Sequence, residues 1–419
     1  VQGQGSSEKD GICMVKKGYK QTEVGVIPEK WKDKKLGDVG KVCMCKRIFA
    51  NQTSNTGEVP FFKIGTFGKE ADAYISKGLY EDYKQRFSYP QKGDVLISAA
   101  GTLGRTIVFE GKDAYFQDSN IVWLDTDKEL LCNEYLYHYY KVIKWGASEG
   151  STIARLYNGI ICNTHIALPD VEEQKQIATV LSEIDELMSL TEKQIAKKKA
   201  IKQGAMQELL TGKKRLPGFS GDWIKSNIGS CIIEKPSYGI NAPAVDFNGF
   251  LPRYIRITDI SEDGRYCKDA QASVSAENVE PFLLKTNDIV LARTGASVGK
   301  SYIYDEHDGR LVYAGFLIKM SIDPQKADSR FIFGVLHTYD YWKWVAQTSM
   351  RSGQPGINGE EYASYEFRMP SDLKEQKAIA DILTNMDNEI VTLGKKLIKY
   401  RQVKQGIMQQ LLTGKIRIT

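Results

Sequence analysis

Two segments of the chain place apolar residues at steps that alternate between four and three positions. An apolar repeat of about 3.5 residues is typical of helices that pack against each other as a coiled coil. The pattern therefore predicts two helices of about 40 residues, each roughly 60 Å long. The predicted packing positions are Ile177, Leu181, Ile184, Met188, Ile195 and Leu209 in the first helix, and Ile379, Leu383, Met386, Ile390, Leu393, Leu397, Ile407 and Leu411 in the second.

Start and stop signals frame both predicted helices. Asp170-x-x-Glu173 and Asp372-x-x-Glu375 each follow a proline and resemble capping boxes, in which the two side chains bond to each other's backbone amides. A Thr-Gly pair at 211–212 and another at 413–414 predict the helix ends, because glycine favours the left-handed conformation found there.

The two helical segments are copies of each other. When the sequence is shifted by 202 residues, "EEQKQIATVLSEID" aligns with "KEQKAIADILTNMD", and 20 of 43 positions from Glu173 to Arg215 are identical. Weaker similarity links Trp31 and "LGDV" to Trp223 and "IGSC", and links "GDVLISAAGTLGRT" to "NDIVLARTGASVGK". The chain is therefore two copies of one plan, a globular part of about 150 residues followed by a long helix.

The charge pattern favours antiparallel pairing of the two helices. Each helix begins with acidic residues, such as Glu172 and Glu375, and ends with basic residues, such as Lys202 and Lys404. Antiparallel packing sets each acidic half against a basic half, whereas parallel packing would align like charges. The alternative is two solvated amphipathic helices that each cover their own globular part.

The globular parts show short β-type runs broken by turns, such as "GDVLISAAG", "NDIVLARTG" and "RLVYAGFLIKM". The run "RTGASVGKS" is similar to a phosphate-binding loop, but Gly295 and Gly299 enclose three residues where that loop needs four. A strand, a turn and another strand are expected after Lys300, and a phosphate site needs a helix there. We therefore interpret these glycines as a tight turn between strands. The fold class predicted is α+β, with two strand-rich parts separated by two long antiparallel helices and a pseudo-twofold internal repeat.

Composition narrows the class of protein only slightly. The chain has 419 residues, 42% of them hydrophobic, and a formal charge of +5, which allows a nucleic-acid partner without requiring one. No apolar run is long enough to span a membrane. The seven cysteines form no CxxC pair, so we expect reduced thiols in a cytoplasmic protein, with Cys43-Met-Cys45 as an alternative redox element. Residues 1–18 are expected to form a flexible leader.

No catalytic or metal-binding motif is found in the sequence, and the four histidines are scattered. The globular parts instead mix basic, amide and aromatic residues as nucleic-acid surfaces do, although each such stretch alone is better explained by a solvated loop. Arg reads guanine edges, Asn and Gln read adenine edges, and Lys, Ser and Thr hold phosphates. The candidate DNA-binding residues are Lys63, Thr66, Lys84, Gln85, Arg86, Arg105, Arg155, Arg253, Arg256, Thr258, Arg293, Thr294, Lys300, Arg351 and Gln354.

These features together resemble the specificity subunit of type I restriction–modification systems. The resemblance spans nearly the whole chain from Tyr19, and its most specific parts are "LPDVEEQKQIATVLSEID" and "MPSDLKEQKAIADILTNMD". It implies two target-recognition domains at 19–170 and 214–370, each reading half of a split DNA target. It also implies a central spacer helix at 171–213 and a distal one at 371–415, which set the gap between the half-sites.

The resemblance also implies the partners of the chain. Adenine methyltransferase subunits and a translocating restriction subunit would assemble on it, and S-adenosylmethionine, ATP and Mg²⁺ would belong to those subunits, with no cofactor on this chain. The chain would bind double-stranded DNA and would not itself be an enzyme. Two alternatives are the specificity portion of a fused restriction–methylation enzyme and a coiled-coil scaffold that does not bind DNA.

Overall fold

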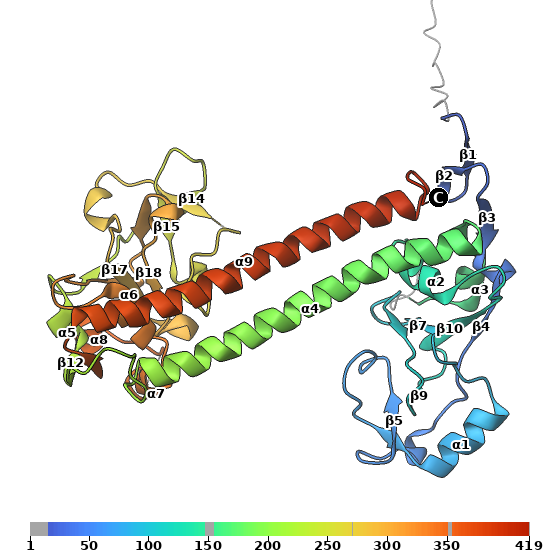
Figure 1. Ribbon diagram of the computed structural model, residues 1–419, viewed down its shortest axis with the longest axis horizontal. Coiled ribbons are helices and arrows are strands. Elements are labelled where there is room, and N and C mark those ends of the chain that lie inside the picture. Colours follow the sequence, from blue (N-terminus) through green and yellow to red (C-terminus); the bar gives the residue numbers. More distant parts are fainter. Residues whose placement is uncertain (1–15, 147–154, 270, 351–353, 419) are drawn as a thin grey trace, which may run out of the picture. The chain divides into compact units, whose positions relative to one another are not determined.

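The chain divides into two compact units. Figure 1 colours the ribbon along the sequence, from blue at the N-terminus to red at the C-terminus. Unit 1 consists of Val1–Thr191 and Lys396–Thr419, and unit 2 consists of Glu192–Lys395. Each long helix therefore contributes to both units. The computed structural model describes residues 16–146, 155–269, 271–350 and 354–418. Most of the predicted leader lies outside these described residues.

Each unit contains a four-stranded antiparallel sheet with the same strand order. The sheet of unit 1 runs β4 (Gly40–Cys43), β10 (Ile121–Thr126), β7 (Val95–Ser98) and β8 (Thr106–Val108). The sheet of unit 2 runs β13 (Ser237–Tyr238), β20 (Leu317–Ser321), β17 (Asp288–Ala292) and β18 (Ser301–Ile303). Every residue of β7 and of β17 is buried, because both sheet faces are covered. The predicted internal repeat is therefore present in the fold.

A second sheet in each unit is built around one parallel strand pair. In unit 1, β5 (Val59–Phe62) lies parallel to β9 (Tyr115–Phe116) and antiparallel to β6 (Tyr74–Ile75). In unit 2, β15 (Arg253–Ile255) lies parallel to β19 (Leu311–Tyr313) and antiparallel to β16 (Ala272–Val274), which also pairs with β14 (Ala244–Asp246). The remaining strand pairs are β1 (Tyr19–Thr22) with β2 (Gly25–Pro28), β3 (Lys32–Lys35) with β11 (His165–Leu168), and β12 (Trp223–Asn227) with β21 (Glu366–Pro370).

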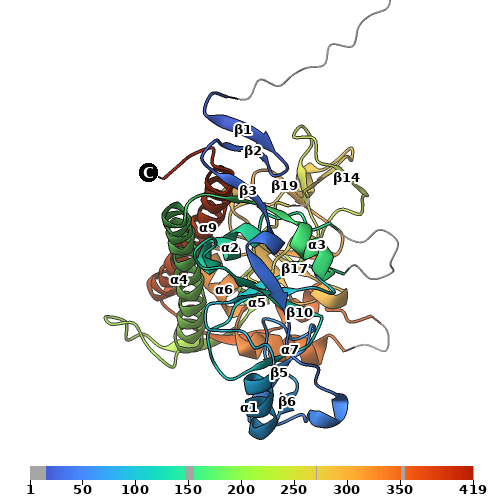
Figure 2. The same cartoon turned by 90° about the vertical axis from the view of Figure 1, so that its right-hand side faces the viewer.

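Short helices complete both units and carry much of their difference. In unit 1, α1 (Lys77–Arg86) lies beside β5, as both Figure 1 and Figure 2 show. In unit 2, α7 (Tyr339–Thr348) buries Tyr341 and Val345 against the sheet. The other short helices are α2 (Asn133–Tyr140), α3 (Asn158–Asn163), α5 (Ile228–Cys231), α6 (Ser329–Val335) and α8 (Gly359–Ala363).

The two long helices, α4 (Val171–Leu209) and α9 (Leu373–Leu411), are antiparallel in each unit, as the charge pattern predicts. In unit 1, Lys404 of α9 pairs with Asp185 of α4. In unit 2, Lys202 of α4 pairs with Asp387 of α9 at 2.6 Å, and Lys198 pairs with Glu389 at 2.5 Å. The predicted packing positions are all buried or half-buried. Those near the helix ends, such as Ile177 and Ile379, are in the two main cores.

The segment that follows each helix packs against the start of the other helix. Arg417, after α9, forms two hydrogen bonds of 2.7 and 2.9 Å with the buried carboxylate of Glu173, which also accepts a 3.0 Å bond from the Trp31 indole. Arg215, after α4, forms two bonds of 2.7 and 2.8 Å with the buried carboxylate of Glu375. We call these two bidentate pairs the unit 1 latch and the unit 2 latch.

The latches correct one prediction about the helix starts. Asp170 does cap α4, because its side chain accepts a 2.9 Å bond from the Glu173 amide. Asp372, however, accepts from the Lys374 amide at 2.8 Å. Neither glutamate reaches back to the capping aspartate, because each carboxylate is used by an arginine. The predicted reciprocal capping boxes are therefore wrong, and the helix ends at the Thr-Gly pairs are confirmed by the left-handed Gly212 and Gly414.

Candidate functional site

The glycine-rich stretch after the central strand forms the same tight turn in both units. In unit 1, Gly101 and Gly104 have φ angles of 68° and 76° between β7 and β8. In unit 2, Gly295 and Gly299 have φ angles of 71° and 89° between β17 and β18. This is the region where glycine is favoured over other residues. The predicted strand turn is confirmed, and Lys300 pairs with Glu262 at 2.7 Å in unit 2.

Three separate segments meet at this turn through equivalent backbone bonds. In unit 1, the Ala99 amide donates to the Asn120 carbonyl at 2.8 Å, and the Leu156 amide donates to the Ala99 carbonyl at 2.8 Å. In unit 2, Arg293 takes the place of Ala99, bonding to the Phe316 carbonyl at 3.0 Å and to the Ile357 amide at 2.9 Å. The backbone frame is therefore the same, whereas the side chains on it are different.

In unit 1 this frame borders a cavity of about 470 Å³ that is rich in cations. Arg155 lines it and donates a 3.1 Å bond to the Ser119 carbonyl. Arg47 lines it from the segment after β4 and pairs with Asp118 at 2.8 Å. The lining residues are Arg47, Ile48, Phe49, Ala50, Thr53, Phe61, Lys63, Gln117, Asp118, Ser119, Asn120 and Arg155. Three cations, one acid and two amides make this cavity suited to a polar, electron-rich ligand.

In unit 2 the frame carries an arginine beside aromatic rings. The Arg293 guanidinium lies 5.0 Å from the centre of the Tyr238 ring, and the Tyr238 hydroxyl accepts a 3.2 Å bond from the Gly359 amide. Phe316, next along the frame, is 59% exposed. An arginine that lies over the face of an aromatic ring contacts the ring without using its N–H groups as hydrogen-bond donors. This surface can therefore offer donors and an apolar face side by side.

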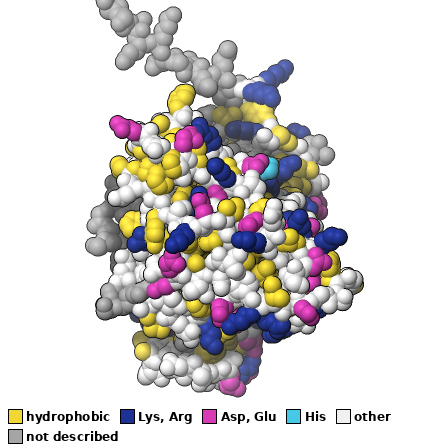
Figure 3. Space-filling model, turned by 90° about the vertical axis from the view of Figure 1, so that its left-hand side faces the viewer, with side chains coloured by type: hydrophobic (Ala, Val, Ile, Leu, Met, Phe, Trp, Pro, Cys, Tyr) yellow, Lys and Arg dark blue, Asp and Glu magenta, His cyan; other side chains and the backbone are white. Residues whose placement is uncertain are grey.

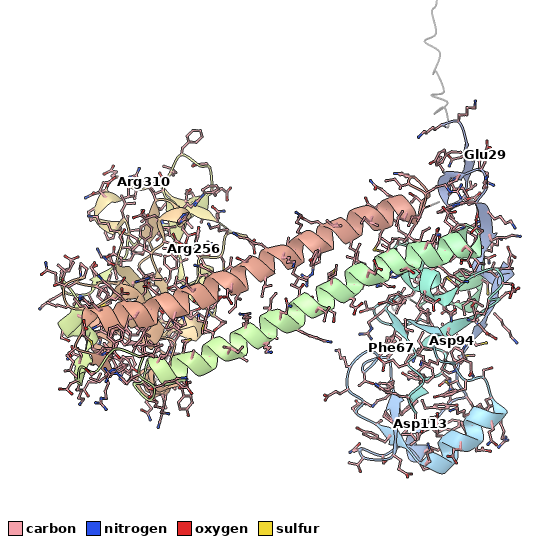
Figure 4. All side chains as sticks on the ribbon, viewed as in Figure 1. Glu29, Phe67, Asp94, Asp113, Arg256 and Arg310 are labelled. Atoms are coloured by element: carbon pink, nitrogen blue, oxygen red, sulfur yellow. The ribbon has the colours of Figure 1, made fainter. Side chains whose placement is uncertain are left out.

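Four candidates predicted in unit 1 come together near the end of β5. Lys63 and Arg155 line the cavity, and the Thr66 hydroxyl accepts from the Lys63 amide at 3.1 Å. Arg105 donates a 3.0 Å bond to the Ile64 carbonyl and lies over the ring of Phe67, which is labelled in Figure 4. The other three candidates are on α1, where Lys84 donates to the Tyr80 hydroxyl at 2.9 Å, Arg86 pairs with Asp82, and Gln85 is exposed.

The candidates predicted in unit 2 fall into two groups. Arg293, Thr294 and Gln354 lie together, because Thr294 bridges to Gly356 and the Gly295 amide donates to the Pro355 carbonyl. The second group makes internal contacts: Arg253 with the Asp308 carbonyl, Arg256 (Figure 4) and Thr258 with Asp259, and Lys300 with Glu262. Arg351 lies outside the described residues.

Sequence reasoning missed Arg47, Gln117, Asn120, Tyr238 and Phe316. The stretch "CKRIFANQTSN" around Arg47 does mix basic, aromatic and amide residues, so the composition used for the other candidates could have found it. Asn120 and Phe316 had no such signal, because they become neighbours of the glycine turn only through the frame bonds. The charges also give little guidance, since Figure 3 shows Lys and Arg interspersed with Asp and Glu on the face it displays.

The residues around the two glycine turns offer hydrogen-bond donors, acceptors and aromatic faces. Among them, no three His, Cys, Asp or Glu side chains come together as metal ligands would. Burial raises the pKa of the Cys45 thiol to about 12 and also raises that of Cys43, so both are neutral thiols. A redox role needs the thiolate, which these shifts disfavour. None of the helices in the described part is long and apolar enough for a membrane span.

Comparisons with known proteins agree on one family. A sequence profile described as the type I restriction modification DNA specificity domain matches residues 28–200 and 222–400. A Haemophilus influenzae protein named as a type I restriction enzyme specificity subunit is 57% identical over 158 residues, covering 38% of this chain and 41% of that relative. The MjaX specificity subunit of Methanocaldococcus jannaschii is 26% identical, covering 96% of this chain and 97% of that one. The crystal structure of the S subunit from M. genitalium shares the fold, with a TM-score of 0.61 at 13% identity over 91% of this chain and 96% of that one.

Proposed function

Because the chain belongs to the type I restriction modification DNA specificity family, we propose that it binds a bipartite double-stranded DNA target, with one half-site for each unit. Family membership itself makes the chain a specificity subunit, and such subunits are the non-catalytic components of type I systems. Family membership therefore confirms the prediction that this chain is not itself an enzyme. What the proposal adds is which parts contact DNA and how.

The observation that carries the proposal is one backbone frame with two different sets of side chains. The glycine turn and its three segments are held by equivalent bonds in both units. On this frame unit 1 presents Arg155 and Asn120, and unit 2 presents Arg293 and Phe316. Arg and Asn are side chains that read base edges, and apolar groups contact the thymine methyl. One fold that presents two chemistries suits a protein that reads two different half-sites.

We assign the spacing of the half-sites to α4 and α9. Each has 39 residues and is therefore about 58 Å long at 1.5 Å per residue. Half-sites on one face of DNA repeat every ~34–36 Å, so helices of this length are long enough to set such a gap.

We also propose that adenine methyltransferase subunits and a restriction subunit assemble on this chain, and that S-adenosylmethionine, ATP and Mg²⁺ act on those subunits. Solvent-exposed apolar residues on the helices, such as Leu190 at 47% and Ile398 at 55%, support a docking role.

A domain exchange tests the proposed function. The strand-rich part of unit 2, residues 214–370, would be replaced by that of a relative with a different target, with both helices kept. We expect the methylated sequence to change in one half and to keep the other half and the gap, because each unit reads separately. Methylation mapping of DNA from cells carrying the complete system gives the answer. A change in both halves would contradict separate reading, and loss of all DNA selectivity with assembly intact would favour a scaffold that does not read DNA.

A single substitution tests the unit 2 surface. Arg293→Ala removes the guanidinium that lies on Tyr238 and leaves the frame bonds of residue 293, which are made by its backbone. If the arginine contacts a base edge, binding weakens by about 1–3 kcal/mol and discrimination is lost at one base pair. Titration of DNA variants with the assembled complex measures this. Unchanged affinity and selectivity would remove Arg293 from the interface.

A further inference from the structure

We propose that Arg47 is the residue with which unit 1 reads a guanine, and that Asp118 is the positioning residue that holds it. This inference rests on the proposed function and names a specificity determinant within it. The relevant contact joins Nε of Arg47 to Oδ2 of Asp118 at 2.8 Å. The two residues are 71 positions apart in the sequence, and the fold brings them together in the lining of the unit 1 cavity.

The contact leaves the terminal nitrogens of Arg47 available. Within the described residues, only Nε of this guanidinium is hydrogen-bonded. Guanine presents two acceptors in the major groove, N7 and O6, and a guanidinium donates to both at once. With Nε bound to the carboxylate, the two terminal N–H groups can form that pair of bonds. The plane of the guanidinium is fixed at the same time, which lowers the entropy lost on binding.

Asp118 is itself held in place. Its side chain is 16% exposed, whereas that of Arg47 is 60% exposed. The Ser119 hydroxyl bonds to Asp118 Oδ2 at 3.3 Å, and the Asn120 amide donates to the Asp118 carbonyl at 2.7 Å. An ordinary pair between two exposed residues is worth little and needs no such support. A supported acid that holds an exposed arginine is instead the arrangement expected where the direction of the arginine matters.

The carboxylate also decides between a base and a phosphate as the ligand of Arg47. A phosphate bound to the free N–H groups would lie close to the negative charge of Asp118, which like-charge repulsion disfavours. The guanine edge is neutral, so it can bind beside the carboxylate. Arg155, which lines the same cavity, can meet the backbone phosphates, whereas Lys63 pairs with Asp72 at 2.8 Å. The Phe49 ring, which is 59% exposed, supplies an apolar wall for the base.

The internal repeat of the chain supports the assignment of Arg47 as a residue that contacts a base. Arg47 follows Cys43 of β4 by four residues, and Asn241 follows Ser237 of β13 by four. Cys43 and Ser237 occupy the same register, since each lies opposite the third residue of the next strand, Trp123 or Lys319. Counting on four residues from this matched pair gives an arginine in unit 1 and an asparagine in unit 2. These are the side chains that read guanine and adenine, respectively.

The test replaces single atoms of the DNA. Once methylation mapping has given the target, duplexes are made in which each guanine of the unit 1 half-site is replaced in turn by 7-deazaguanine, which lacks the N7 acceptor. We expect one such duplex to bind the assembled complex roughly 10- to 100-fold more weakly. The Arg47→Ala complex should bind the natural duplex with a similar loss and should lose nothing further on that modified duplex. Asp118→Asn, which keeps the size but not the charge, should relax selectivity at the same base pair alone.

Control variants separate this inference from the proposed function. Lys112→Ala removes an exposed cation of unit 1 that pairs with Glu110 at 2.7 Å, and it should leave both affinity and selectivity unchanged. Selectivity for the unit 2 half-site shows that each variant is folded and assembled. An unmodified complex that ignores the target sequence would overturn the proposed function itself. A unit 1 half-site without guanine, or an Arg47→Ala complex that weakens uniformly on all sequences, would overturn the role of Arg47 alone.

Discussion

We expect Arg417→Met to lower the free energy of unfolding of unit 1 by about 3 kcal/mol. The substitution leaves the Glu173 carboxylate, which is 4% exposed, without its cation. The Trp31 indole still donates one bond to it, but a single neutral donor does not compensate a buried charge. Amide hydrogen exchange of the full chain measures the effect, because it reports the opening of each unit separately. Peptides from β7 and β10 should exchange faster, and those from β17 and β20 should not.

The second latch provides the matched variant. Arg215→Met removes the cation from Glu375, which is 1% exposed, so the faster exchange should now appear in unit 2. The double variant Glu173→Gln with Arg417→Met should regain most of the lost stability, because a neutral amide needs no cation. Equal losses in the single and double variants would mean that packing of the arginine side chain, and not the buried charge, accounts for the effect.

Acid is expected to destabilise unit 1 through His138. Burial lowers the pKa of this fully buried side chain to about 4, from an ordinary value of 6.5, with a further lowering by Lys141 and Lys404 and an opposing effect of Asp185. Between pH 6.5 and 4 the unfolded chain therefore binds a proton that the folded unit does not, and folding stability falls. A shift of this size corresponds to about 3 kcal/mol. His138→Gln, which can still bond to Ser182 but does not titrate, should remove this loss.

The charged groups near His138 do not mask the loss of stability expected between pH 6.5 and 4. Burial opposes ionisation of Asp185, but Lys404 and Lys141 outweigh it and hold the pKa of that carboxyl below 3.8. Its contribution is therefore lost only below about pH 4. Burial also lowers the pKa of His337 in unit 2, so the measurement must be specific to unit 1. Urea unfolding at pH 7.0, 5.5 and 4.5, read by proteolysis of unit 1 peptides, compares the two proteins. Parallel pH profiles would contradict the assignment.

The helices and their direction could be predicted because their causes are local and repeated. The apolar spacing, the Thr-Gly ends and the opposite charges at the two ends of each helix are all visible in the sequence. The glycine turn was also predictable, because the number of residues between Gly295 and Gly299 and the strand pattern after Lys300 exclude a phosphate loop. Each of these inferences needs only residues that are close together in the chain.

The candidate site was harder to predict because it is made from distant segments. Arg47 meets Asp118 only after β4 and β9 have taken their places, and Phe316 reaches the glycine turn through a backbone bond to Arg293. The capping role predicted for Glu173 and Glu375, the glutamates of the two latches, was wrong for a similar reason. Glu173 is close in sequence to the capping Asp170, but Arg417 provides a full charge and two bonds. The fold therefore selects the more distant partner.

The way in which unit 1 is assembled has a consequence for the order of events during translation. Its main core includes Met408, Leu411 and Leu412 beside residues as early as Ile27. Unit 2, by contrast, is one uninterrupted stretch of chain, Glu192–Lys395. A nascent polypeptide can thus complete unit 2 first, while unit 1 still waits for residues 396–419, which leave the ribosome after unit 2. During that interval the start of α4 lacks its partner helix, which is when a chaperone would be most useful.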